Sequence, residues 1–159
     1  MSKLKRYYEE GQIYFVTSNT YSRKPFFEEE DKAGFLLNIL RYYKSIFCFK
    51  IFAYCIMPDH IHLVIQPAKC VDLSKIMKHI KGNFAVNLDG RMKKNGKVWQ
   101  HNFYDVIIRD EQELAGKINY IHNNAVSKEL VRCAEDYPYS SAKVYIKDEK
   151  DYLADKYIS

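Results

Sequence analysis

KIFAYCIMPDHIHLVIQ, residues 50–66, contains two apolar segments separated by a Pro-Asp pair. Residues 50–57 form a continuous apolar run, which is typical of a buried strand. The run stops at Pro58, because proline is poorly tolerated inside a central strand. Residues 60–66 resume as a strand and end before Pro67. The stretch therefore predicts a hairpin of two neighbouring strands.

Strands and helices are also predicted on both sides of this hairpin. β-Branched and aromatic residues mark the strands, and apolar residues at helical spacing mark the helices. Capping residues indicate where two of the helices begin. The predicted elements are a strand at 12–20, a helix at 31–47, the hairpin, a helix from Asp72 or Ser74, a strand at 104–109, and a helix from the capping box of Asp110 and Glu113 to about Asn124.

The resulting order, β-α-β-β-α-β-α, favours an α+β fold with a central antiparallel sheet and helices packed on it. The chain has 159 residues, of which 47% are apolar and 15% aromatic, so it is long enough to bury one sizeable core. We therefore expect a single domain over residues 1–159, with the C-terminal tail from about residue 143 left unassigned.

The composition also restricts the cellular setting. No apolar stretch approaches the roughly 18 residues that a membrane-spanning helix needs, and the N-terminal residues lack the apolar core of a signal peptide. The four cysteines form no CxxC pair and indicate reduced thiols rather than a disulfide framework; they are Cys48, Cys55, Cys70 and Cys133. We expect a cytoplasmic protein without a membrane partner.

Positive charge is concentrated in one segment. Residues 69–97 contain eight cations and two anions, a net +6, whereas the whole chain carries only +5, so the remainder sums to −1. Such a segment is typical of a polyanionic partner, although a solvated helix face followed by a charged loop would look the same. The candidate DNA-binding residues are Lys75, Lys78 and Lys81 on the helix, and Arg91, Lys93, Lys94 and Lys97 in the loop.

The second hairpin strand contains two histidines that are separated by one residue. Side chains alternate along a strand, so His60 and His62 point to one face while Ile61 and Leu63 point to the other. Two neutral imidazoles side by side are suited to share one divalent cation. The alternative is a pair of half-exposed histidines on the sheet surface, and the triplet alone does not exclude it.

The last predicted helix carries a second set of chemical groups. Tyr120 and Asn124 are four residues apart, so they lie on the same face of the helix. The amide oxygen of Asn124 is a suitable ligand for Mg²⁺ or Mn²⁺, and the Tyr120 phenol is a potential nucleophile. Tyr120 is, however, one of fourteen tyrosines, and its position alone assigns it no role.

Several ordered motifs resemble one known family. MPDHIH, WQ, YIHNN and DYPYSS occur in this order at 57–62, 99–100, 120–124 and 136–141. Together they resemble the HUH single-tyrosine transposases and are most similar to the REP-associated tyrosine transposases, relatives of small transposases of bacterial insertion sequences. The resemblance spans nearly the whole chain, from Arg6 to about Ser141.

This resemblance implies a compact domain with a ferredoxin-like or RRM-like sheet and a role for each motif. His60 and His62 match the metal-binding histidines, Tyr120 matches the nucleophile, and Asn124 matches the polar residue that can complete the site. The implied cofactor is a divalent metal, Mg²⁺ or Mn²⁺. The implied reaction is cleavage and strand transfer of single-stranded or hairpin DNA through a 5′-phosphotyrosine, by a monomer or a homodimer.

One departure and one alternative remain. The family usually has proline after the asparagine, whereas this chain has Ala125, so the helix can extend further. A catalytically silent hairpin-binding protein of the same fold is the alternative function. Trp99, Phe103 or Tyr104 could stack on unpaired bases, although packing in the core competes as an explanation for each.

Overall fold

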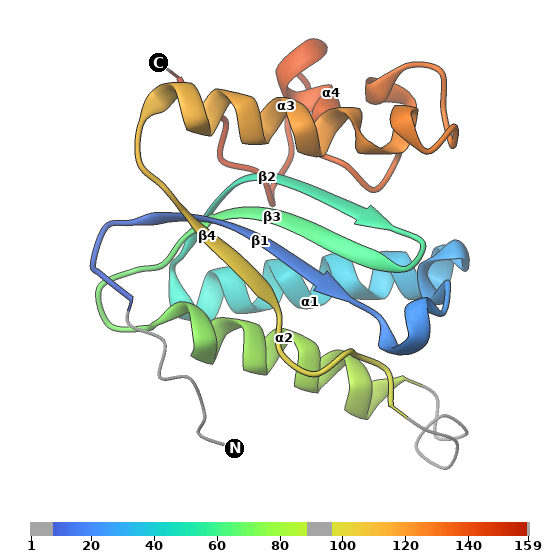
Figure 1. The fold of residues 1–159 in the computed structure, drawn as a ribbon, viewed down its shortest axis with the longest axis horizontal. Coiled ribbons are helices and arrows are strands. Elements are labelled where there is room, and N and C mark those ends of the chain that lie inside the picture. The colour runs from blue at the N-terminus through green and yellow to red at the C-terminus, as the bar shows by residue number, and fades with distance from the viewer. Residues whose placement is uncertain (1–7, 89–96, 159) are drawn as a thin grey trace.

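The computed structural model describes residues 8–88 and 97–158 (Figure 1). Its strands and helices follow the predicted order closely, with short 3-10 turns at 21–23, 26–28 and 134–136. The elements are β1 (Ile13–Asn19), α1 (Glu30–Phe47), β2 (Lys50–Met57), β3 (His60–Gln66), α2 (Leu73–Asn87), β4 (Tyr104–Ile108), α3 (Glu111–Ser127) and α4 (Ala142–Ile146).

The four strands form one sheet in the order β2-β3-β1-β4, and each pair of neighbours is antiparallel. With helices after β1 and β3, the first six elements have the β-α-β-β-α-β connectivity of the ferredoxin-like folds. The predicted α+β class with a central antiparallel sheet is therefore confirmed. The hairpin of residues 50–66 places β3 in the interior of the sheet.

Helices cover both faces of the sheet, so the fold has three layers. α1 and α2 lie on one face, and α3 and α4 lie on the other (Figure 1). The strands contribute alternate side chains to the two resulting cores: Ile61 and Leu63 of β3 face α1 and α2, whereas Val64 belongs to the cluster with Ile118 and Ile121 of α3. This alternation gives the two faces of β3 different environments.

The capping residues begin the helices as predicted. The Asp72 carboxylate accepts a hydrogen bond from the Lys75 backbone N–H at 2.7 Å, and Asp110 does the same for Glu113 at 2.8 Å. The end of α3 differs from the prediction, because the helix continues past Asn124 to Ser127. Alanine at position 125 keeps the backbone N–H that proline would remove, which allows this extension.

The C-terminal segment packs along the outer edge of β2. The Ser141 N–H donates to the Tyr54 carbonyl at 3.0 Å, and the Asp155 N–H donates to the Ile51 carbonyl at 2.7 Å. Leu153 is fully buried in the core beneath. The segment therefore satisfies strand-edge groups that would otherwise be free to pair with another chain.

Within the described ranges, no helix is both long and apolar enough to cross a membrane.

Candidate active site

His60 and His62 lie on the α3 side of the interior strand β3. Their side chains are buried, with only 5% and 3% of their surface exposed. Ile61 and Leu63 point to the opposite core, as the strand alternation predicts. The alternative of two half-exposed surface histidines is therefore wrong, and the two imidazoles require a reason to be buried.

The rings face each other through one nitrogen each. The His60 Nε2 and His62 Nε2 atoms are 3.1 Å apart. The second nitrogen of each ring has a hydrogen-bond partner. His60 Nδ1 lies 2.6 Å from Asp59 Oδ1, and His62 Nδ1 lies 2.8 Å from Thr17 Oγ1. A carboxylate can only accept, so Nδ1 of His60 carries the proton and its Nε2 presents a lone pair.

Burial keeps these imidazoles neutral. It is the largest cause that lowers the pKa of His62 to about 3, and the charges of His60, Arg23 and Lys117 lower it further. The pKa of His60 is also lowered by burial, although Asp59 opposes the change. Neutral imidazoles keep the lone pairs that a metal ion needs.

Asn124 completes the cluster from α3. Its Nδ2 lies 3.2 Å from His62 Nε2, while its Oδ1 is buried without any hydrogen-bond partner. An orphaned amide oxygen is costly unless another group uses it. The described residues contain no group of three His, Cys, Asp or Glu side chains that could hold a metal. Two imidazole nitrogens and this oxygen nevertheless form a donor set suited to a divalent cation.

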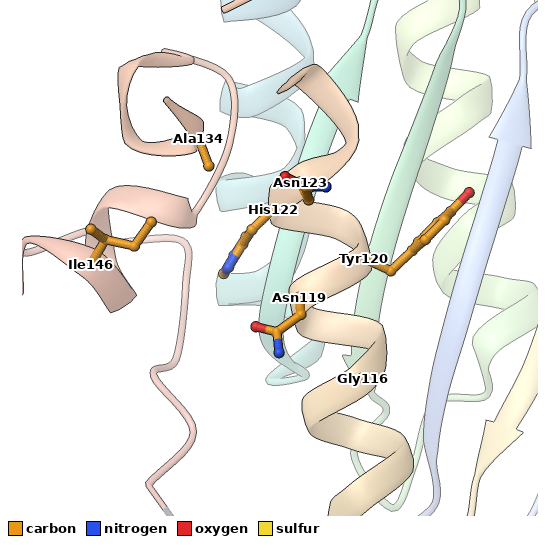
Figure 2. Close-up of a pocket in the computed structure, with 7 residues that line it drawn as sticks. All are labelled: Gly116, Asn119, Tyr120, His122, Asn123, Ala134 and Ile146. Carbon is orange, nitrogen blue, oxygen red and sulfur yellow. The ribbon is translucent and has the colours of Figure 1, made fainter. Parts of the chain in front are cut away.

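Tyr120 lies one turn before Asn124 on α3 and has 54% of its surface exposed. Its ring meets the His62 ring edge-on at 5.5 Å between centroids, and the Phe15 ring at 5.9 Å. Figure 2 shows the side chain leaving α3 toward the strands, with its hydroxyl at the far end. The phenol is therefore both accessible to a large substrate and adjacent to the histidine pair.

A pocket of about 500 Å³ adjoins the same helix, and its lining includes Tyr120. Asn119 and His122 point into it, away from the Tyr120 ring (Figure 2). His122 Nε2 lies 2.7 Å from the Ser141 hydroxyl, which ties α3 to the C-terminal segment. His122 thus has a packing role, and the pocket lies apart from the histidine pair.

The predicted DNA-binding lysines of α2 lie in the layer on the opposite side of the sheet from Tyr120 (Figure 1). Lys75 and Lys78 are exposed there. Lys81 instead donates to the carbonyls of Gln100 and Asn102, at 3.2 and 2.7 Å, and so anchors the segment before β4. Exposed Lys97 lies over the Tyr21 ring. Arg91, Lys93 and Lys94 lie outside the described residues.

Other cations surround the histidine pair, and the sequence analysis missed them. Arg23 donates to Asp59 at 2.8 Å and to Asn19 at 2.7 Å. Lys117 lies near the middle of α3 and Lys128 caps its C-terminal end, and each lowers the pKa of one histidine. Spacing could have identified the two lysines, because they lie three residues before and eight residues after Tyr120, on the same helix face.

The buried histidine pair of β3 and the exposed Tyr120 of α3 therefore form one candidate site on a ferredoxin-like sheet. The chain belongs to the family described as "Transposase IS200 like", whose model matches residues 8–124, and it is thus a DNA transposase by family. The matched range includes both histidines, Tyr120 and Asn124.

Individual relatives agree with this assignment. The REP-associated tyrosine transposase of Escherichia coli is 28% identical, over 89% of this chain and 82% of its own length. A Haemophilus influenzae protein, provisionally named as the same kind of transposase, is 29% identical over 94% and 90%. A solved REP-associated tyrosine transposase bound to a REP hairpin shares the fold over the full length of both chains, with a TM-score of 0.75 at 23% identity.

Proposed function

We propose that the protein cleaves and rejoins single-stranded DNA in a metal-dependent reaction, with Tyr120 as the nucleophile. One observation carries the proposal: two buried imidazole nitrogens 3.1 Å apart and an orphaned amide oxygen lie beside an exposed tyrosine. A purely structural cluster would leave the Asn124 oxygen unsatisfied and the phenol without a function.

His60, His62 and Asn124 would hold the cation, and the nitrogen and oxygen donors suit Mn²⁺ or Mg²⁺. The cation would supply a Lewis acid that offsets negative charge on the scissile phosphate during attack. Asp59 and Thr17 orient the two imidazoles from behind. Rotation of the Asn124 amide by half a turn would bring its oxygen to the side where its nitrogen now meets His62.

The chemistry at Tyr120 would proceed in two balanced steps. The phenol oxygen forms a bond to phosphorus and loses its proton, while the bond from phosphorus to the 3′ oxygen breaks and a 3′-hydroxyl is released. The 5′-phosphotyrosine conserves the phosphodiester energy, so another 3′-hydroxyl can reverse the step and join the strand without ATP. A DNA strand can reach the Tyr120 hydroxyl only if this side chain is exposed, and 54% of its surface is.

Hairpin-containing DNA is the proposed substrate. A structure that shares the fold over the whole chain is that of a REP-associated tyrosine transposase bound to a REP hairpin. The exposed cations on both sides of the sheet, Lys75 and Lys78 on α2 and Lys128 after α3, would neutralise DNA phosphates. A catalytically silent hairpin-binding protein is the competing function, and it would bind the same DNA without forming a covalent bond.

Incubation of the protein with a labelled hairpin oligonucleotide that carries single-stranded flanks tests the proposal. With Mn²⁺ or Mg²⁺, a protein–DNA adduct that survives denaturation is expected, and EDTA should prevent it. Binding of the oligonucleotide without any adduct, over a range of flanking sequences and both metals, would support the silent alternative.

The carboxylate behind His60 provides a second test. Asp59→Asn would replace an acceptor that fixes the Nδ1 proton of His60, and such changes typically lower metal affinity about 10- to 100-fold. Titration calorimetry with Mn²⁺ measures the effect directly. Asp31→Asn, at an exposed position in the first turn of α1, is the matched control and should bind Mn²⁺ like the wild type. Equal Mn²⁺ affinity of the Asp59→Asn variant and the wild type would contradict the assigned orientation of His60.

A further inference from the structure

The face of the sheet that carries the histidine pair is only partly covered. α3 packs through Ile118, Ile121 and Ala125 against residues of β2 and β3. Farther toward the other edge, Tyr104 of β4 has 62% of its surface exposed. A large aromatic side chain that is this exposed on a sheet surface gains little from packing in the free protein, so its position suggests a contact with a partner.

Tyr104, Thr17 and His62 are aligned across three neighbouring strands of the sheet. Thr17 of β1 is directly opposite Tyr104 on one side and directly opposite His62 on the other. Residues directly opposite each other in an antiparallel sheet share a face, and the Thr17–His62 hydrogen bond identifies that face as the α3 side. Two strand spacings, about 10 Å, therefore separate the Tyr104 backbone from that of His62.

Lys117 adds a positive charge to the same surface. Its ammonium lies 4.5 Å from the centre of the Phe15 ring, and that ring is stacked on His62 at 5.4 Å. The charge acts on His62, whose pKa it lowers. In the described ranges, no carboxylate forms an ion pair with Lys117. A half-buried cation over the ring that stacks on His62 is suited to a phosphate next to the candidate metal site.

We propose that single-stranded DNA next to the scissile phosphate lies across this β1–β4 surface, with one base stacked on Tyr104 and a neighbouring phosphate bound by Lys117. An aromatic platform beside a cation is the combination that binds unpaired strands, since every base has a stacking face while a duplex hides it. The surface is continuous with the Tyr120 site. The inference rests on the proposed function, because that function places the scissile phosphate beside Tyr120.

Binding of two oligonucleotides separates this surface from the rest of the DNA interface. One is a hairpin with single-stranded flanks on both sides, and the other is the same hairpin without flanks. Tyr104→Ala is expected to weaken binding of the flanked hairpin about tenfold, a typical loss for one stacked base, and to leave the flankless hairpin unchanged. Tyr104→Phe should retain the affinity, because it keeps the ring.

Lys117→Gln should weaken the flanked hairpin and reduce the salt dependence of its binding, with the slope of log K against log salt falling by about 0.7 for one lost contact to a single strand. Matched controls are available elsewhere: Tyr42→Ala on α1, where the tyrosine is 58% exposed, and Lys50→Gln at the start of β2, on the opposite edge strand. Both control variants should bind like the wild type.

Three results would overturn the inference. The first is an unchanged affinity of Tyr104→Ala for the flanked hairpin, and the second is an equal loss of affinity for both oligonucleotides. The third is a wild type that is a dimer on gel filtration and a Tyr104→Ala variant that is a monomer, which would make the surface an interface between two copies. The adduct assay is independent of these. If wild type forms no adduct while the flank-specific loss is present, the cleavage proposal fails and the strand-binding surface stands.

Discussion

Tyr120→Phe is expected to abolish the covalent protein–DNA adduct while leaving Mn²⁺ affinity and DNA affinity close to wild type. The change removes one oxygen atom and keeps the ring, so the contacts with His62 and Phe15 are retained. Loss of a catalytic nucleophile lowers turnover by a factor on the order of 10⁴ or more in other enzymes that form covalent intermediates. The fold should be unaffected, because the hydroxyl of Tyr120 makes no hydrogen bond within the described residues.

The measurement is the labelled-hairpin assay, read on a denaturing gel in parallel with Mn²⁺ titrations of the same protein. Tyr104→Phe is the matched control, because Tyr104 is also an exposed tyrosine on this side of the sheet. It should form the adduct at the wild-type level. An adduct that persists in Tyr120→Phe and disappears in Tyr104→Phe would transfer the role of nucleophile to Tyr104.

The fold was largely predictable because its local signals are strong and agree with one another. Pro58 separates two apolar runs, and the Asp72 and Asp110 caps begin helices where the apolar periodicity changes. The end of α3 was less predictable. Ala125 permits continuation of the helix without determining its length, and the helix instead ends where Glu129 adopts a left-handed backbone, φ 59°.

The site was predictable only in part, because it combines residues that are distant in sequence. Alternation along β3 places the two histidines on one face, and helical spacing places Tyr120 above Asn124. Neither pattern indicates that Thr17 supports His62 from 45 residues away, since that contact depends on the register of β1 against β3. Nor does either pattern indicate that the Arg23 guanidinium reaches Asp59 beside His60.

The charge pattern shows the same limit. The cations of residues 69–97 predicted a DNA-binding segment without placing it relative to the histidine pair, and α2 and the pair lie on opposite sides of the sheet (Figure 1). Sequence spacing gives the face of a helix and not the layer in which that helix packs. Lys117 and Lys128, outside that segment, lie closer to the chemistry, since both act on the histidine pair.

His62→Ala is expected to remove the stabilisation by Mn²⁺ and the DNA adduct together. His62 Nε2 is the one donor that meets both other groups, His60 Nε2 at 3.1 Å and Asn124 Nδ2 at 3.2 Å. A cation that binds only the folded state stabilises it by about 2.7 kcal/mol at a concentration one hundred times its dissociation constant. The wild type should therefore melt at a higher temperature when Mn²⁺ is added, whereas His62→Ala should show no shift.

The metal-free comparison makes this test specific to the proposed site. Without a cation, the Nε2 atoms of two buried imidazoles lie 3.1 Å apart, and the Asn124 oxygen has no partner. Truncation of His62 removes a buried polar ring whose desolvation folding has to offset, so it should cost less stability without Mn²⁺ than the 2–5 kcal/mol typical of comparable truncations in an apolar core. His79→Ala, on α2, is the control and should keep the full Mn²⁺ shift. A large loss of stability without metal, combined with a retained Mn²⁺ shift, would show that His62 serves packing and that the cation binds elsewhere.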